Sequence, residues 1–98
     1  MKNFEGKKYI IRGDRSGVFY GEISNKEGQE IEIRNCRRLW YWDGACSISE
    51  LAEKGTQKPV NCKFSVIVNS LIITDAIEII ECTDKAIKSI EGVKEWKY

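Results

Sequence analysis

Residues 30–34 alternate between charged and apolar side chains, in the order Glu30, Ile31, Glu32, Ile33 and Arg34. Successive side chains of a strand point to opposite faces, so a period of two predicts a strand whose isoleucines share one face. That face is expected to meet a core, while the charged face meets water. The strand can continue through residues 38–40.

Further strand candidates are separated by short turn sequences. They are rich in β-branched or aromatic side chains and comprise residues 7–12, 18–24 and 63–68. The predicted turns are residues 13–17, 25–28 and 69–70. Residues 71–81 form one bent strand or two short strands, because Asp75-Ala76 interrupts the apolar run. Hairpin connections of this kind predict a mainly antiparallel sheet.

Two short helices are predicted from their capping residues. Ser47 and Glu50 form a capping box, in which Ser47 accepts a backbone hydrogen bond and Glu50 reaches back, and Gly55 ends that helix. Thr83 is the cap of a second helix over residues 84–91. The predicted fold class is therefore α+β, a mainly antiparallel β-sheet of about five strands with two short helices. One domain is expected to span residues 1–98.

Composition limits the classes of partner. Of the 98 residues, 16 are Lys or Arg and 15 are Asp or Glu, so the net charge is +1. This balance argues against a general polyanion binder, and nucleic acid is not an expected partner, but a local basic site stays open. No apolar stretch is long enough to span a bilayer, and residues 1–6 lack the core of a signal peptide. We therefore expect a cytoplasmic protein that does not contact membranes.

The four cysteines are widely spaced, and the chain contains no histidine. A zinc site needs closely paired ligands, usually with histidine, so neither a metal nor a cofactor is predicted. We expect four free thiols, with Cys36 and Cys82 as small core residues. Without histidine the usual general base is missing, and no Ser or Cys lies in a nucleophile motif. The chain is therefore not expected to be an enzyme.

Residues 34–47 hold the strongest candidate for a binding site. Three arginines stand beside three aromatic residues, and the run ends at a predicted Asp-Gly turn. Arginine presents a planar donor fork that fits a phosphate, and an aromatic ring offers a face for a base. The candidate ligand-binding residues of this run are Arg34, Arg37, Arg38, Trp40, Tyr41, Trp42 and Asp43.

Strand parity leaves the roles of the three arginines open. In a regular strand Arg34 shares a face with Arg38, and the two can grip one phosphate. A bulge near Asn35 would reverse that conclusion. Arg37 and Arg38 are neighbours and point to opposite faces, so one of them can line a pocket while the other faces solvent or pairs with a glutamate. The alternative interpretation is a pair of solvated strand arginines.

The aromatic residues divide in the same way. Trp40 and Trp42 share one face and are either core anchors beneath a helix or part of the site. If they are core, Tyr41 faces outward and is the stacking ring. Asp43 is either a turn residue or a contact to a base edge or a ribose hydroxyl.

The loop at residues 12–17 is a second candidate. Its backbone N–H groups can cradle an anion flanked by Arg12 and Arg15, although the spacing does not match a Walker-type phosphate loop. The alternative interpretation is a simple hairpin turn.

The run from residue 34 to residue 45 resembles a family of small tailed-phage and prophage proteins. Their pattern is, in outline, an Ala-Arg-Arg core followed by an aliphatic residue, Trp, any residue, Trp, any residue, Gly and Ala. Here residues 36–45 read Cys-Arg-Arg-Leu-Trp-Tyr-Trp-Asp-Gly-Ala, and the similarity covers residues 12–96. Cys36 replaces the alanine, and Arg15-Ser16 replaces a small Ser-Ala pair, which adds a charge beside the candidate site.

The resemblance implies a phage or prophage origin. Small proteins of this context are often counter-defence factors, and one such group sequesters nucleotide second messengers, either cyclic oligonucleotides or cyclic ADP-ribose isomers. The expected function is therefore non-catalytic binding of such a ligand in the host cytoplasm. A 98-residue chain has little room for a deep cavity, so the pocket is expected between subunits of a homo-oligomer. The alternative is a protein–protein interaction module that inhibits a host factor or serves as a minor phage structural protein.

Overall fold

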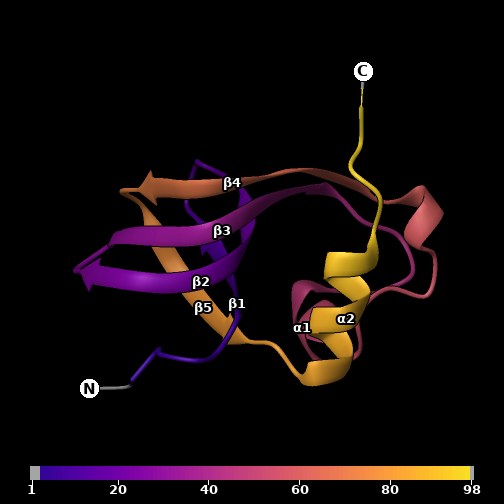
Figure 1. The fold of residues 1–98 in the computed structure, drawn as a ribbon, viewed down its shortest axis with the longest axis horizontal. Helices are drawn as coiled ribbons and strands as arrows, with labels where there is room; N and C mark the ends of the chain where they lie inside the picture. Colours follow the sequence, from indigo (N-terminus) through magenta and orange to yellow (C-terminus); the bar gives the residue numbers. More distant parts are fainter. Residues whose placement is uncertain (1–2, 98) are drawn as a thin grey trace.

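The computed structural model describes residues 3–97. Its strands form one antiparallel five-stranded sheet in the order β4-β3-β2-β1-β5, with helices α1 and α2 at one side (Figure 1). The elements are β1 (Tyr9–Gly13), β2 (Val18–Glu27), β3 (Glu30–Tyr41), α1 (Ile48–Lys54), the 3-10 turn η1 (Pro59–Asn61), β4 (Lys63–Ile73), β5 (Ala76–Glu81) and α2 (Asp84–Gly92). The predicted α+β class with two short helices is confirmed.

The sheet is strongly curved. β4 and β5 lie at opposite ends of the strand order, yet only Thr74 and Asp75 connect them. So short a connection requires the sheet to curl until its two edges approach, and Figure 1 shows β5 crossing behind β2 and β3. The concave face therefore encloses a core of its own, built around Ile11, Phe19 and Ile33.

The convex face is covered by the two helices. Ile10 and Tyr20 point to this side and pack against Leu51 of α1 and Ile90 of α2. Residues 9–11 of β1 are therefore buried on both faces, which explains why they are apolar without alternation. The helices begin as predicted: the Ser47 hydroxyl accepts a hydrogen bond from the Glu50 backbone N–H, at 3.1 Å. Thr83 caps α2 in the same way.

A bulge in β3 decides which way its arginines point. Tyr20 pairs with Arg37 and Glu22 pairs with Arg34, so β3 carries one residue more than β2 in this interval. Asn35 has a positive φ of 49° and absorbs the extra residue. Arg34 consequently shares the convex face with Arg37, and Arg38 points to the concave face. The regular-strand prediction, which put Arg34 beside Arg38, is wrong, and the bulge alternative is correct.

Several predicted boundaries change. The strand predicted to end at Ser24 continues to Glu27, and its turn is the two-residue link of Gly28 and Gln29, with Gly28 at φ 60°. The turn predicted at residues 69–70 is wrong, because β4 runs straight through it to pair with β3. Residues 71–81 are two strands rather than one.

The four thiols are free, as predicted, with Cys36 and Cys82 buried. Within the described part of the chain, neither helix has the length and apolar character that a membrane crossing requires.

Candidate functional site

A surface groove centred on Arg38 is the most distinctive concave feature near the predicted site. It consists of two adjoining hollows that share Ser16 and Arg38. One hollow, of about 500 Å³, extends toward Trp40 and Trp42. The other, of about 550 Å³, extends between the loop at Arg15 and the end of β4. The groove therefore places a guanidinium between two indole rings and a polar loop.

The Arg38 guanidinium stacks on a buried ring and keeps N–H donors available for a ligand. Its guanidinium carbon lies 4.5 Å from the centroid of the Phe19 ring, which is fully buried. One Nη1–H donates to the Ser16 carbonyl at 2.8 Å. Among residues 3–97 no Asp or Glu lies within ion-pair distance of this guanidinium. A half-buried cation that is stacked on a ring and lacks a carboxylate partner is suited to an external anion.

The two tryptophans form one wall of the groove. Trp40 lies on the same face of β3 as Arg38, and 65% of it is exposed. Trp42 is half-buried and packs against the helix-side core. The core interpretation is therefore wrong for Trp40 and partly correct for Trp42. Tyr41 is 51% exposed, pairs with Lys63 on β4 and does not line the groove.

Arg37 lies outside the groove and is almost completely buried, at 3% exposure. Its Nε–H donates to the Ser65 carbonyl and its Nη1–H to the Ile90 carbonyl, each at 2.8 Å. Burial lowers the pKa of Arg37, and the nearby Glu95 and Glu91 oppose this effect. The geometry gives Arg37 a structural task, which is to connect the end of α2 to β4.

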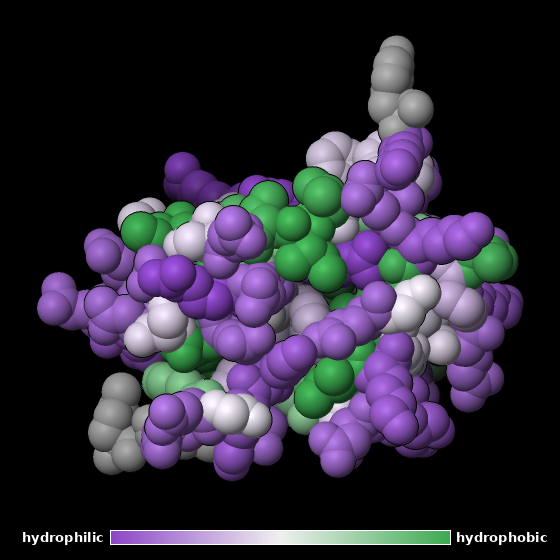
Figure 2. All heavy atoms as spheres, in the orientation of Figure 1, coloured by the Kyte–Doolittle hydropathy of each residue, from purple (hydrophilic) through white to green (hydrophobic). Residues whose placement is uncertain are grey.

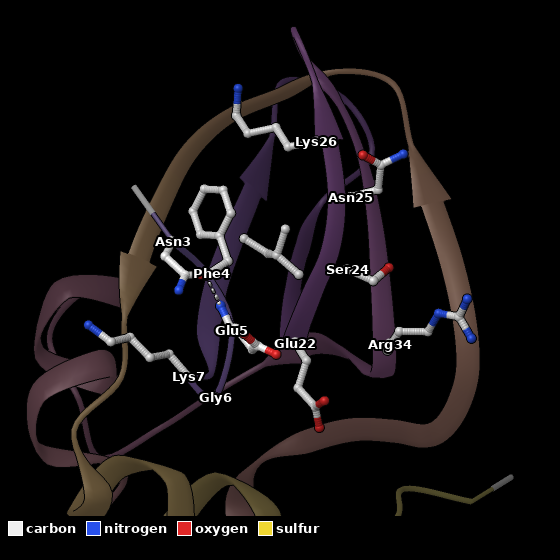
Figure 3. Close-up of a pocket in the computed structure, with 11 residues that line it drawn as sticks. Asn3, Phe4, Glu5, Gly6, Lys7, Glu22, Ser24, Asn25, Lys26 and Arg34 are labelled. Atoms are coloured by element: carbon white, nitrogen blue, oxygen red, sulfur yellow. Dashed lines mark hydrogen bonds between the residues drawn. The ribbon is translucent and has the colours of Figure 1, made fainter. Parts of the chain in front are cut away.

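Arg34 and Arg12 also lie away from Arg38. Arg34 makes an exposed ion pair with Glu32 at 3.3 Å, and Arg12 pairs with Glu78 at 2.9 Å. Figure 3 shows Arg34 at the margin of a separate hollow beside the N-terminal segment, with its guanidinium directed away from Phe4. Of the predicted arginines, the structure therefore brings only Arg38 and Arg15 to one groove.

The loop between β1 and β2 forms the predicted cradle for an anion, and Asp75 occupies it. The backbone N–H groups of Arg15 and Ser16 donate to Asp75 Oδ2 at 2.7 and 2.9 Å, and the Ser16 hydroxyl donates to Oδ1 at 2.6 Å. These hydrogen bonds, the Ser16 hydroxyl first, hold the pKa of Asp75 below its usual range. These hydrogen bonds attach the loop to the β4–β5 connection, and we call them the Asp75 latch. The sequence signal for this role of Asp75 was its position as an acidic residue within the apolar run of residues 71–80.

Asp43 is engaged in the turn that follows β3. Its carboxylate accepts hydrogen bonds from the Gly44 N–H at 2.8 Å and from the Asn61 amide at 3.0 Å. The Asn61 contact is the larger cause of the lowered pKa of Asp43. The turn interpretation is confirmed, and this carboxylate is partnered within the chain. Within the described range, no group of three or more Cys, Asp or Glu side chains is arranged to hold a metal ion.

Comparison with known proteins assigns the chain to a family. Residues 6–90 match the family described as Domain of unknown function (DUF6948). The chain belongs to this family. The DUF6948 match includes every residue named in the Arg38 groove, from Arg15 to Asp75, and ends within α2. No curated protein matches the chain, and no solved structure matches it. The family description names neither an activity nor a phage origin.

Proposed function

We propose that this protein is a non-catalytic binding protein for a small ligand that combines an anionic group with a planar ring. The observation that carries the proposal is the Arg38 guanidinium, which lies over Phe19 in an open groove and has no carboxylate partner among the described residues. Its remaining donors would hold a phosphate. Trp40 and Trp42 would supply the surface on which a base stacks.

The ligand class that fits best is a nucleotide second messenger. The resemblance of residues 34–45 to tailed-phage proteins supports a counter-defence role in the host cytoplasm, in which a cyclic oligonucleotide or a cyclic ADP-ribose isomer is sequestered. Sequestration requires tight binding and no chemistry. It is compatible with a groove whose ionisable residues are arginines and a latched aspartate.

A homo-oligomer is part of the same proposal. Each hollow of the groove is shallow and open, so a second subunit could close it over a ligand. Apolar side chains are exposed along β4, at the upper edge in Figure 2. These side chains are Val66, Ile67, Val68 and Ile72.

Titration calorimetry with a panel of cyclic nucleotides and cyclic ADP-ribose isomers tests the proposal. Arg38→Lys keeps the charge but loses the planar fork, and should weaken binding by about tenfold or more. Arg12→Ala is the matched control, because it removes an exposed arginine outside the groove, and its affinity should stay within about twofold of wild type. Small molecules released from protein purified from cells that make cyclic nucleotides should be identified by mass spectrometry. No binding to any ligand of the panel would contradict the proposal.

A second candidate function is protein–protein interaction, as an inhibitor of a host factor or a minor phage structural protein. Exposed Trp40 and Trp96 lie beside each other, and large aromatic residues are enriched at interface hot spots. A pull-down from host lysate separates the two candidates. A stoichiometric protein that is lost on Trp40→Ala would favour this second candidate, whereas a co-purifying nucleotide would favour the first.

A further inference from the structure

Trp40 is a wall of the groove and is exposed at 65%, so its position needs an explanation. An exposed indole at the end of a strand is free to change rotamer, and a mobile ring makes a poor stacking surface. The other residues of the groove contact only one side of the Trp40 indole. A second contact to the Trp40 indole comes from a residue near the C-terminal end of the described chain.

That contact is Trp96. The ring centroids of Trp40 and Trp96 are 5.6 Å apart, with 36° between their planes. The Lys63 ammonium lies 5.4 Å from the centroid of the Trp96 ring. Trp96 is therefore placed between the groove wall and a cation at the start of β4, in contacts that favour one orientation of its indole.

The segment of residues 93–96, which carries Trp96, is held at Val93 and again where it meets β4. It leaves α2 at Val93, which is buried in the helix-side core at 3% exposure. It then runs beside β4, where the backbone N–H of Trp96 donates to the Phe64 carbonyl at 2.9 Å and Glu95 forms a parallel bridge with Phe64. Figure 1 shows this segment passing β4 after the end of α2.

Arg37 strengthens the same connection. It bonds the carbonyls of Ile90, in the last turn of α2, and of Ser65, next to Phe64 on β4. The start of the segment and its docking point on β4 are thus joined by one buried side chain. Residues 93–96 lie beyond the 6–90 range of the family match, so Trp96 reaches Trp40 from outside the matched residues.

We propose that the C-terminal segment positions Trp40 as the stacking wall of the groove, with Trp96 as the positioning residue. Trp96 does not line the groove and acts through Trp40. The inference rests on the proposed function, because it assigns the wall of that same groove to the planar part of the ligand. It predicts that Trp96 affects ligands with a base more than ligands without one.

A ligand-free measurement tests the Trp40–Trp96 contact on which the positioning depends. Fluorine NMR of protein labelled with 5-fluorotryptophan reports the chain's three indoles separately, after assignment with Trp40→Phe and Trp42→Phe. Trp96→Ala should move the Trp40 resonance by more than its linewidth, Trp96→Phe should move it less, and Val60→Ala should leave it in place. Val60 is the control because it is 92% exposed and lines the same small hollow as Trp96 but does not line the groove. An unmoved Trp40 resonance in Trp96→Ala overturns the proposal.

Calorimetry tests the consequence, using nucleotides from the panel and ribose 5-phosphate, which lacks a base. Trp96→Ala should weaken nucleotide binding roughly two- to tenfold, which is the value of one aromatic contact, and Trp96→Phe should recover most of this loss. Affinity for ribose 5-phosphate should change by less than about twofold. Equal weakening of both ligands overturns the inference. If wild-type protein binds no ligand, the proposed function fails, and the NMR result still decides whether Trp96 positions Trp40.

Discussion

Arg37 and Arg38 are adjacent arginines with opposite tasks. Arg38 keeps donors available to solvent, whereas Arg37 satisfies two backbone carbonyls inside the protein. Arg37→Ala would remove both hydrogen bonds and leave the buried Ile90 carbonyl without this donor, so we expect a loss of about 2–4 kcal/mol in unfolding free energy. Urea denaturation followed by circular dichroism measures this. Arg34→Ala is the control, with an expected change below about 0.5 kcal/mol, because its ion pair is exposed. Similar losses in the two variants would argue against the structural task of Arg37.

At the same scale, residue types were easier to predict than residue directions. The cluster of cationic and aromatic residues at 34–43 drew attention to this segment, and one of its arginines lines a groove with two tryptophans. The direction of each side chain depended on whether Asn35 was a bulge, and both alternatives are compatible with the sequence. Phe19 and Ser16, which hold Arg38 from another strand and a loop, carry no motif of their own.

Among the elements, the β2–β3 pair depends on a close approach at Gly21. A Cβ atom there would lie 2.8 Å from the Arg34 carbonyl oxygen and 2.6 Å from a methyl group of Ile33. Gly21→Ala should therefore destabilise the protein by about 1–3 kcal/mol, since the backbone of β3 must move. Gly92→Ala is the matched control, because nothing lies within 4 Å of the added atom, and its stability should stay close to that of wild type. Equal thermal midpoints for both variants would contradict the packing at the bulge.

The loop between β1 and β2 is attached to the β4–β5 connection through an ionised Asp75. Its pKa is lowered in the folded protein by the hydrogen bonds it accepts, so its contribution to stability is present above the unfolded value of about 3.9. That contribution is lost as the pH falls through the lower folded pKa. Asp75→Asn should therefore lower the thermal midpoint at pH 7 and lose less stability than wild type between pH 5 and pH 2.5. Asp14→Asn, in the same loop, serves as control, and a wild-type pH profile in Asp75→Asn would refute the latch.

For the whole molecule, sequence patterns predicted the features that depend on neighbouring residues, namely strands and helix starts. The period-two run predicted β3 correctly, and the two helix caps predicted where α1 and α2 begin. The turn predicted at residues 25–28 is shorter, because β2 continues to Glu27. The curling of the sheet could not be predicted, because the short β4–β5 connection requires it only when β4 and β5 lie at opposite ends of the strand order. The same curvature brings the loop at Arg15, the end of β4 and Arg38 to one groove, so the site is a product of topology rather than of one motif.

The outer edge of β4 leads to the last prediction, at the scale of assembly. Beyond Phe64, where the C-terminal segment pairs with it, this edge strand carries no charged residue up to Ile73, and Val66, Ile67 and Val68 are all exposed. An uncharged edge strand of this length favours pairing with another strand. A second copy supplies the same neutral strand in antiparallel orientation about a two-fold axis, with no charge left opposed.

Sedimentation equilibrium at micromolar concentrations should therefore give at least twice the 11.3 kDa mass of one chain. Ile67→Lys places charges against each other across the pair and should restore the single-chain mass. Ile77→Lys, at an exposed position on β5, should leave the assembly intact. A wild-type protein that sediments as one chain would contradict the oligomer. An Ile77→Lys variant that dissociates while Ile67→Lys does not would instead move the interface to β5.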